Sequence, residues 1–156
     1  MKSVADIEQK LGYSFKRKKL LARALTRKAF AKDNPAISDE LGDQDTLRLI
    51  GSAVIGLFVL EHFFLRKERN SRKDLEEYRR KYGNIFTLAV IGNSIQLQEH
   101  VSWGSTEIQR GLWDLEKSDA VGECFEAIAG ALYLDGGMEA ISRVFSDLKF
   151  FGTIEE

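Results

Sequence analysis

Apolar residues recur every three or four positions along most of the chain, which is the spacing of one face of a helix. In the stretch VADIEQKL these residues are Val4, Ile7 and Leu11, and Gly12 follows as a helix end. The same spacing predicts further helices over residues 16–26, 43–67, 71–83, 84–97, 119–137 and 138–151. Residues 32–40 and 98–119 lack a clear period, so we expect loops there that contain short helical pieces.

The segment 43–67 is the most apolar of the predicted helices. It is apolar nearly all round, which predicts a buried helix at the centre of the core. Its longest apolar run, AVIGLFVLEHFFL, is interrupted by Glu61 and His62 and is too short to span a bilayer, so we expect no membrane association. One proline and 13 glycines, placed mostly at element ends, favour an all-α single domain over residues 1–156.

Composition narrows the class of protein further. Apolar residues make up 44% and charged residues 30% of the chain, which is typical of a soluble globular domain. Cys124 is the single cysteine, so an internal disulfide is excluded and a reducing, cytoplasmic location is expected. The net charge of −1 gives no bulk attraction to polyanions, but Lys and Arg cluster in residues 16–19 and 66–73. Such clusters are either solvated helix faces or contacts to phosphate.

Four stretches carry a resemblance to a known family: LGYSFKRKKLLARALT, DTLRLIGSAV, DLEEYRRKYGN and GECFEAIAGALYLDGG. In this order and with these gaps they resemble the ribonuclease III catalytic domain family over roughly residues 7–145. The resemblance implies an all-α fold like that of the ribonuclease III endonuclease domain. The double-stranded-RNA-binding domain that usually accompanies it is not expected within residues 1–156. Arg27 stands where the family usually has a histidine.

The resemblance also implies a metal site, and this chain departs from it. In the family four carboxylates hold Mg²⁺, two at i and i+4 on the signature helix and two at i and i+3 on a later helix. Residues at these spacings share a helix face, so two facing helices bring the four acids together. Here Arg48 and Ser52 replace the first pair, while Glu123 and Glu126 keep the second. The retained catalytic acids and metal ligands, if any, are therefore Glu123 and Glu126, and Mg²⁺ is expected only in an active enzyme.

Arg48 changes the charge of the site. A guanidinium is cationic at any working pH and pairs with carboxylates through a planar fork. We favour an ion pair between Arg48 and Glu126 or Glu123 that takes the place of Mg²⁺, because two facing acids without a cation are costly. The alternative is that Arg48 points to solvent. Ser52 supplies no anionic ligand, so a site of two glutamates would hold only a weakly bound, largely hydrated ion.

Two kinds of partner follow from the resemblance. The first is double-stranded RNA, and the candidate contact residues are Lys16, Arg17, Lys18, Lys19, Arg72 and Lys73. The second is another subunit, in a homodimer or in a heterodimer with a related protein. Leu49 stands where the family has an aromatic residue at the dimer interface, and it keeps that position apolar. Trp103 and Trp113 either stack on RNA bases or pack a loop.

Three functions remain open at this point. The favoured one is a catalytically silent or impaired ribonuclease III-like domain that acts in RNA processing or RNA–protein assembly. The alternative is an active Mg²⁺-dependent endonuclease for double-stranded RNA with a rearranged site. A helical interaction module that never contacts nucleic acid is the third, and salt-dependent affinity for RNA distinguishes it from the first.

Overall fold

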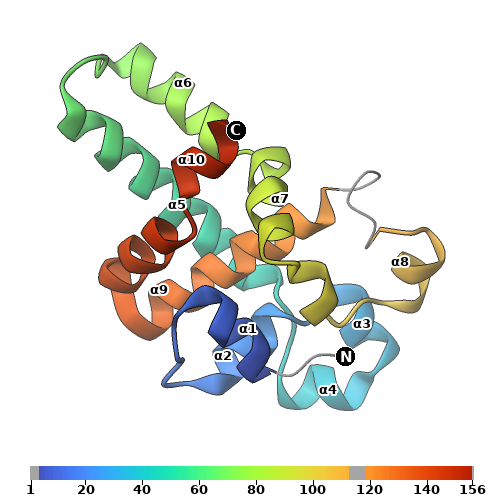
Figure 1. The fold of residues 1–156 in the computed structure, drawn as a ribbon. Coiled ribbons are helices and arrows are strands. Elements are labelled where there is room, and N and C mark those ends of the chain that lie inside the picture. The colour runs from blue at the N-terminus through green and yellow to red at the C-terminus, as the bar shows by residue number, and fades with distance from the viewer. Residues whose placement is uncertain (1–3, 113–118, 156) are drawn as a thin grey trace.

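The computed structural model describes residues 4–112 and 119–155, and helices account for all the regular elements in this part of the chain (Figure 1). The prediction of an all-α fold is confirmed. The elements are α1 (Val4–Leu11), α2 (Lys18–Ala24), α3 (Lys28–Asp33), α4 (Pro35–Glu40), α5 (Asp45–Arg66), α6 (Arg72–Gly83), α7 (Ile85–Ser94), the 3₁₀ helix η1 (Leu97–His100), α8 (Ser105–Gln109), α9 (Ala120–Asp147) and α10 (Phe150–Glu155).

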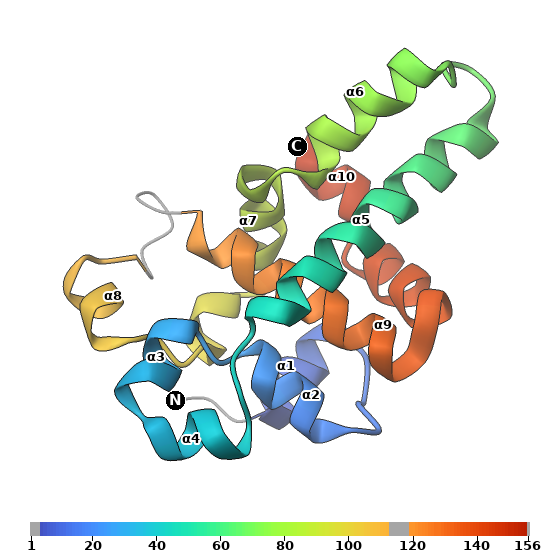
Figure 2. The same ribbon diagram turned by 180° about the vertical axis from the view of Figure 1, so that it is seen from behind.

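Two long helices, α5 and α9, cross at the centre of the molecule (Figure 2). Glycines allow their backbones to touch at the crossing. A Cβ atom on Gly51 would lie 1.7 Å from the carbonyl oxygen of Glu126, and one on Gly130 would lie 2.1 Å from that of Leu47. No side chain fits into such gaps, so these glycines fix the crossing point. The crossing brings the start of α5 against the first turns of α9.

The prediction that α5 is buried all round is wrong in part. One face carries Leu47, Val54 and Val59, each less than a tenth exposed, and packs on the core. Another face exposes Leu49 (75%) and Leu57 (54%). Apolar residues thus follow α5 on both sides, and only tertiary packing distinguishes the buried side from the open one. By length and composition alone α5 qualifies as a membrane-crossing helix, with 33% of its most apolar window buried.

Element ends follow the local sequence signals. Ser71 caps α6, since its hydroxyl accepts from the backbone N–H of Asp74 while the Asp74 carboxylate accepts from the N–H of Ser71. The expected break between residues 137 and 138 is present within α9, where Gly137 has φ 69° and ψ −167°. The segment expected to form the last helix up to residue 151 is divided, because α9 ends at Asp147 and α10 begins at Phe150.

The connection from α1 to α2 is anchored on α9. Asp135, with a fully buried side chain, accepts hydrogen bonds from the backbone N–H groups of Lys16 and Arg17 at 2.9 Å each. It also accepts from the hydroxyl of Tyr13 at 2.8 Å. Burial raises the pKa of Asp135, but these donors outweigh it and the pKa lies below its ordinary value. The loop is therefore held by a charged, multiply bonded carboxylate.

Candidate functional site

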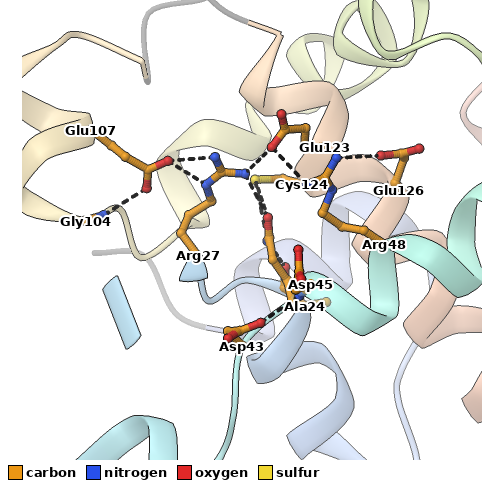
Figure 3. Close-up of polar contacts among 11 residues, drawn as sticks. Ala24, Arg27, Asp43, Asp45, Arg48, Gly104, Glu107, Glu123, Cys124 and Glu126 are labelled. Atoms are coloured by element: carbon orange, nitrogen blue, oxygen red, sulfur yellow. Dashed lines mark hydrogen bonds and ion pairs between the residues drawn. The ribbon is translucent and has the colours of Figure 1, made fainter. Parts of the chain in front are cut away.

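The site begins with Arg48, one turn into α5. Because α5 and α9 touch at Gly51 and Gly130, the side chain of Arg48 reaches the first two turns of α9 (Figure 3). Its Nη1 lies 3.2 Å from Oε2 of Glu123, and its Nη2 lies 3.3 Å from Oε1 of Glu126. The Arg48 side chain is 27% exposed, so it does not point to solvent. The predicted ion pair of Arg48 with Glu126 or Glu123 is present, and Arg48 in fact contacts both acids.

A second guanidinium, that of Arg27, enters the same site from the loop before α3. Its Nη1 donates to the same Oε2 atom of Glu123 at 2.9 Å. On its other side Nε and Nη2 donate to Oε2 of Glu107 at 2.9 and 2.6 Å. Sequence reasoning noted Arg27 only as the residue in place of a histidine. Its part in the site was missed, because it depends on a loop fold that the helical pattern does not reveal.

Neutral groups hold the Arg27 side chain in position. Gln44 accepts from Nη1 of Arg27 at 3.0 Å and donates through Nε2 to the carbonyl of Ala24 at 2.7 Å. The guanidinium lies 5.5 Å from the ring centre of Trp103, a distance that permits a cation–π contact. Trp103 thus packs a loop in this structure, whereas Trp113 lies outside the described residues. The Arg27 side chain is only 13% exposed and has little freedom to leave.

Glu107 is the second residue that sequence reasoning missed. It lies on α8, in the segment expected to be irregular, and its side chain is 9% exposed. Its Oε1 accepts from the backbone N–H of Gly104 at 3.1 Å, while its Oε2 pairs with Arg27. No spacing in the sequence relates Glu107 to Glu123, so no local signal pointed to it.

The electrostatics of the site are those of compensated, partly desolvated charges. Burial raises the pKa of Glu126, and the neighbouring Glu123 adds to this, while Arg48 opposes it; the pKa remains above its ordinary value. Burial lowers the pKa of Arg27, but hydrogen bonds to Glu107 and Glu123 outweigh it, so the guanidinium stays charged. Burial raises the pKa of the Cys124 thiol to about 11, so Cys124 is a protonated core residue and not a nucleophile.

The residues present do not fit a magnesium ion. Mg²⁺ requires oxygen ligands at near-octahedral geometry, and carboxylates supply its charge balance. Here the Oε2 atom of Glu123 is shared by two guanidinium groups, and Arg48 also holds Glu126. Among residues 4–112 and 119–155 no group of three or more His, Cys, Asp or Glu side chains is arranged to hold a metal. The two arginines provide the charge balance that a cation would otherwise supply.

Ser52, which the resemblance places at the second ligand position, lies about one helical turn after Arg48 on α5. It is exposed and lines a separate hollow of about 750 Å³ between α5 and α6, together with Leu57, Arg79 and Arg80. Leu49 is exposed beside Arg48 on the outer face of α5. Asp45 is 55% exposed and lies 3.8 Å from the ammonium of Lys28, so it takes no part in the cluster on Glu123.

The predicted RNA-contact residues fall into two groups at opposite ends of the molecule. Residues 16–19 lie by α2, whereas Arg72 and Lys73 lie at the tip of the hairpin that α5 and α6 form (Figure 1). Some of these cations already have intramolecular partners: Lys18 pairs with Glu8 at 2.6 Å and Arg72 with Glu76 at 3.2 Å. Exposed pairs of this kind contribute little to stability.

Comparison with known proteins agrees with the fold and the order of the motifs. A family profile described as Ribonuclease-III-like matches residues 17–150. Ribonuclease 3 of Campylobacter jejuni is 33% identical over 139 residues, which covers 89% of this chain and 58% of that protein. Ribonuclease 3 of Pseudomonas fluorescens is 32% identical over 138 residues. The chain therefore spans a little over half the length of these relatives.

Solved structures extend the likeness to three dimensions. The nuclease domain of ribonuclease III from Campylobacter jejuni, described as flexible in a region involved in dimer formation, superposes with a TM-score of 0.80 at 31% identity. The match covers 94% of this chain and 95% of that domain. A further crystal structure of the same domain gives a TM-score of 0.79 at 32% identity. The chain belongs to the ribonuclease III-like family.

Proposed function

We propose that the chain is a catalytically silent ribonuclease III-like domain that binds double-stranded RNA and acts in RNA processing or RNA–protein assembly. The observation that carries this proposal is the pair of guanidinium groups on Glu123, from Arg27 at 2.9 Å and Arg48 at 3.2 Å. Both arginines are fixed by further acids, Glu107 and Glu126. A cytoplasmic location is part of the same proposal.

The loss of activity follows from the loss of the metal. A bound divalent ion lowers the pKa of its water and stabilises charge that develops on a phosphate. Arginine can stabilise such charge, but it cannot generate a hydroxide at neutral pH, because its own pKa is too high for it to act as a base. With no carboxylate at positions 48 and 52 to hold a metal, hydrolysis of the phosphodiester has no activated water.

Cleavage of a long duplex RNA in Mg²⁺ or Mn²⁺ tests this proposal. We expect no cutting by the native protein and restored cutting by the variant Arg27→His, Arg48→Glu, Ser52→Asp. Arg27→His is included because Arg27 also pairs with Glu123. The changes at positions 48 and 52 alone would leave this guanidinium in the site. Adding Glu126→Gln to the restored variant should abolish cutting again, which excludes a contaminating nuclease.

The same assay decides the alternative function, an active Mg²⁺-dependent endonuclease. One observation favours that alternative, namely that Glu123 and Glu126 still converge on one point of the crossing. Robust cutting by the native protein that Glu126→Gln abolishes would refute the silent-domain proposal. Glu126 would then be a catalytic residue of a site in which the arginines move away.

We further propose that the chain acts as a dimer, either with itself or with a related subunit. Leu49 and Leu57 lie two turns apart on one side of α5 and expose 75% and 54% of their surface. Exposed apolar side chains on a single helix face support a protein interface. The neighbouring hollow of about 750 Å³ supplies a concave surface with two arginines, which suits a partner that carries both apolar and acidic groups.

A further inference from the structure

A hollow of about 420 Å³ opens directly beside the ion-pair cluster. Its inner wall is formed by Arg27, Arg48 and Glu123, and its outer wall by α3. Lys28 and Lys32 lie four residues apart on α3, so both side chains are on the face that lines the hollow. Lys28 has 73% of its side chain exposed, and Lys32 is also exposed. Neither lysine belongs to the basic clusters noted in the sequence.

The position of α3 is fixed by contacts with α8. The carboxylate of Asp33 accepts from the backbone N–H of Ser105 at 2.9 Å and from its hydroxyl at 3.0 Å. A Cβ atom on Gly104 would lie 2.5 Å from that of Ala29, so the two segments touch. The two lysines are therefore presented by a helix that is tied to the same element as Glu107. The outer wall of the hollow is preorganised.

The charge of the hollow differs from that of a carboxylate metal site. Of the described residues that line it, four are cationic and three are acidic. The inner arginines are engaged by Glu107, Glu123 and Glu126, whereas Lys28 has only a long, exposed pair with Asp45 at 3.8 Å. Water and salt screen such a pair. An anion at the mouth of the hollow thus meets two available ammonium groups, and behind them two guanidinium groups compensate two of the three carboxylates in the cluster.

We infer that this hollow binds a backbone phosphate of duplex RNA through Lys28 and Lys32 without a divalent cation. A site of bare acids repels phosphate and needs a metal between them, while here the two internal arginines compensate most of the acid charge and so reduce that repulsion. The inference rests on the proposed function, since it presumes that the chain binds RNA. It adds two contact residues and a property, metal-independent binding, that the sequence did not indicate.

The experiment measures the affinity of the full chain for a short perfect RNA duplex by fluorescence anisotropy, across a series of salt concentrations. Each titration is run once in EDTA and once in Mg²⁺. The test variant is Lys28→Gln, Lys32→Gln. The matched control is Lys10→Gln, Lys149→Gln, which removes the same charge from residues outside the hollow. A third variant, Lys28→Arg, Lys32→Arg, keeps the charge.

We expect the native chain to bind equally well in EDTA and Mg²⁺. The test variant should bind roughly tenfold more weakly at low salt, and its salt slope should fall by about 1 for each phosphate that the chain ceases to neutralise. The control and the arginine variant should match the native chain. Circular dichroism of each variant shows whether it remains folded.

Three outcomes would overturn the inference. In the first, the test variant binds RNA with native affinity and native salt dependence, which would place the RNA-binding surface elsewhere on the chain. In the second, native binding requires Mg²⁺. In the third, polyglutamate competes with RNA for Lys28 and Lys32 as well as a duplex does, which indicates an acidic protein as the ligand. Failure of the native chain to bind RNA at all would instead refute the proposed function itself.

Discussion

At the scale of single residues, Arg48 places a guanidinium where the family resemblance predicts a carboxylate, and it contacts both neighbouring acids. Its two terminal nitrogens reach Glu123 and Glu126, while its Nε is buried without a hydrogen-bond partner. An orphaned buried donor has a cost, so the pair is not optimised for stability alone. Glu123 and Glu126 need this cation, because removing Arg48 would leave their partly buried charges without that partner, which costs free energy.

Arg48→Leu is expected to lower the free energy of unfolding by about 1–3 kcal/mol at neutral pH. The pKa of Glu126 is already raised, and loss of Arg48 raises it further. A carboxyl group whose pKa is higher in the folded state than in the unfolded state binds protons more readily in the folded state. The free energy of unfolding therefore falls as the pH rises from the unfolded-state pKa through the folded-state pKa. The destabilisation should therefore be greatest at neutral pH and shrink as the pH falls through the raised pKa of Glu126 toward the ordinary pKa of glutamate.

Urea unfolding of Arg48→Leu and of the native chain at several pH values measures this dependence. Arg110→Leu, at the end of α8, serves as a control because Arg110 is exposed and lies outside the hollow. A loss of stability in Arg48→Leu that is no larger than the control's, and stays constant from about pH 4 to neutral pH, would show that Arg48 does not compensate Glu126.

The sequence predicted one half of the candidate site and not the other. Arg48, Glu123 and Glu126 lie on long helices whose spacing assigns them to a shared face, and the family pattern brings the two helices together. Arg27 and Glu107 come from a loop and a helix of five residues, and no period connects them. Their meeting depends on tertiary contacts such as the pairing of Thr26 with Ser102, which only the folded chain reveals.

At the scale of elements, the crossing of α5 and α9 determines whether the site exists. Gly51 and Gly130 permit a backbone approach that places Arg48 opposite both acids. The helices themselves were predictable, because their apolar periods and end signals are local. The buried face of α5 was not predictable, since Leu49 and Val54 are both apolar. Only the position of α9 makes Leu49 exposed and Val54 buried.

Two glycines in α5 provide a matched test of this crossing. Gly51→Ala places a methyl group against the backbone oxygen of Glu126, so we expect a loss of about 3 kcal/mol or more in the free energy of unfolding. At Gly56 a Cβ atom meets only the Cδ atom of Arg79 at 3.6 Å, which is an ordinary contact. Gly56→Ala should therefore be neutral or stabilising by about 0.5–1 kcal/mol. Thermal and urea unfolding compare the two variants, and equal stability would disprove the close crossing.

At the scale of the whole molecule, charge and apolar surface are divided between different regions. The cationic hollow lies beside α3, and the exposed apolar face lies along α5. The hairpin of α5 and α6, which carries basic residues at its tip, projects beyond the body (Figures 1 and 2). A rod-like polyanion that contacts both the hollow and the hairpin tip gains from each, because effective concentration favours the second contact once the first is made. A dimer would double the number of such contacts.

The dimer itself is tested by Leu49→Glu, Leu57→Glu. Two carboxylates on the outer face of α5 would be buried without partners in an interface that uses this face, which is prohibitive for association. We expect the native chain to be a dimer by light scattering coupled to size-exclusion chromatography, and the variant to be a folded monomer. Ile108→Glu is the control, because Ile108 on α8 is 55% exposed but lies away from α5.

A native chain that stays monomeric at all accessible concentrations leaves a heterodimer as the remaining form of the proposal, and the apolar face then needs a related subunit to cover it. The same variant also tests whether dimerisation contributes to RNA binding. Leu49→Glu, Leu57→Glu should also reduce RNA affinity if dimerisation joins two hollows on one duplex, and should leave it unchanged if each subunit binds alone. Unchanged dimerisation in the variant would place the interface elsewhere, because an interface centred on these two leucines cannot accommodate four buried charges, two from each subunit.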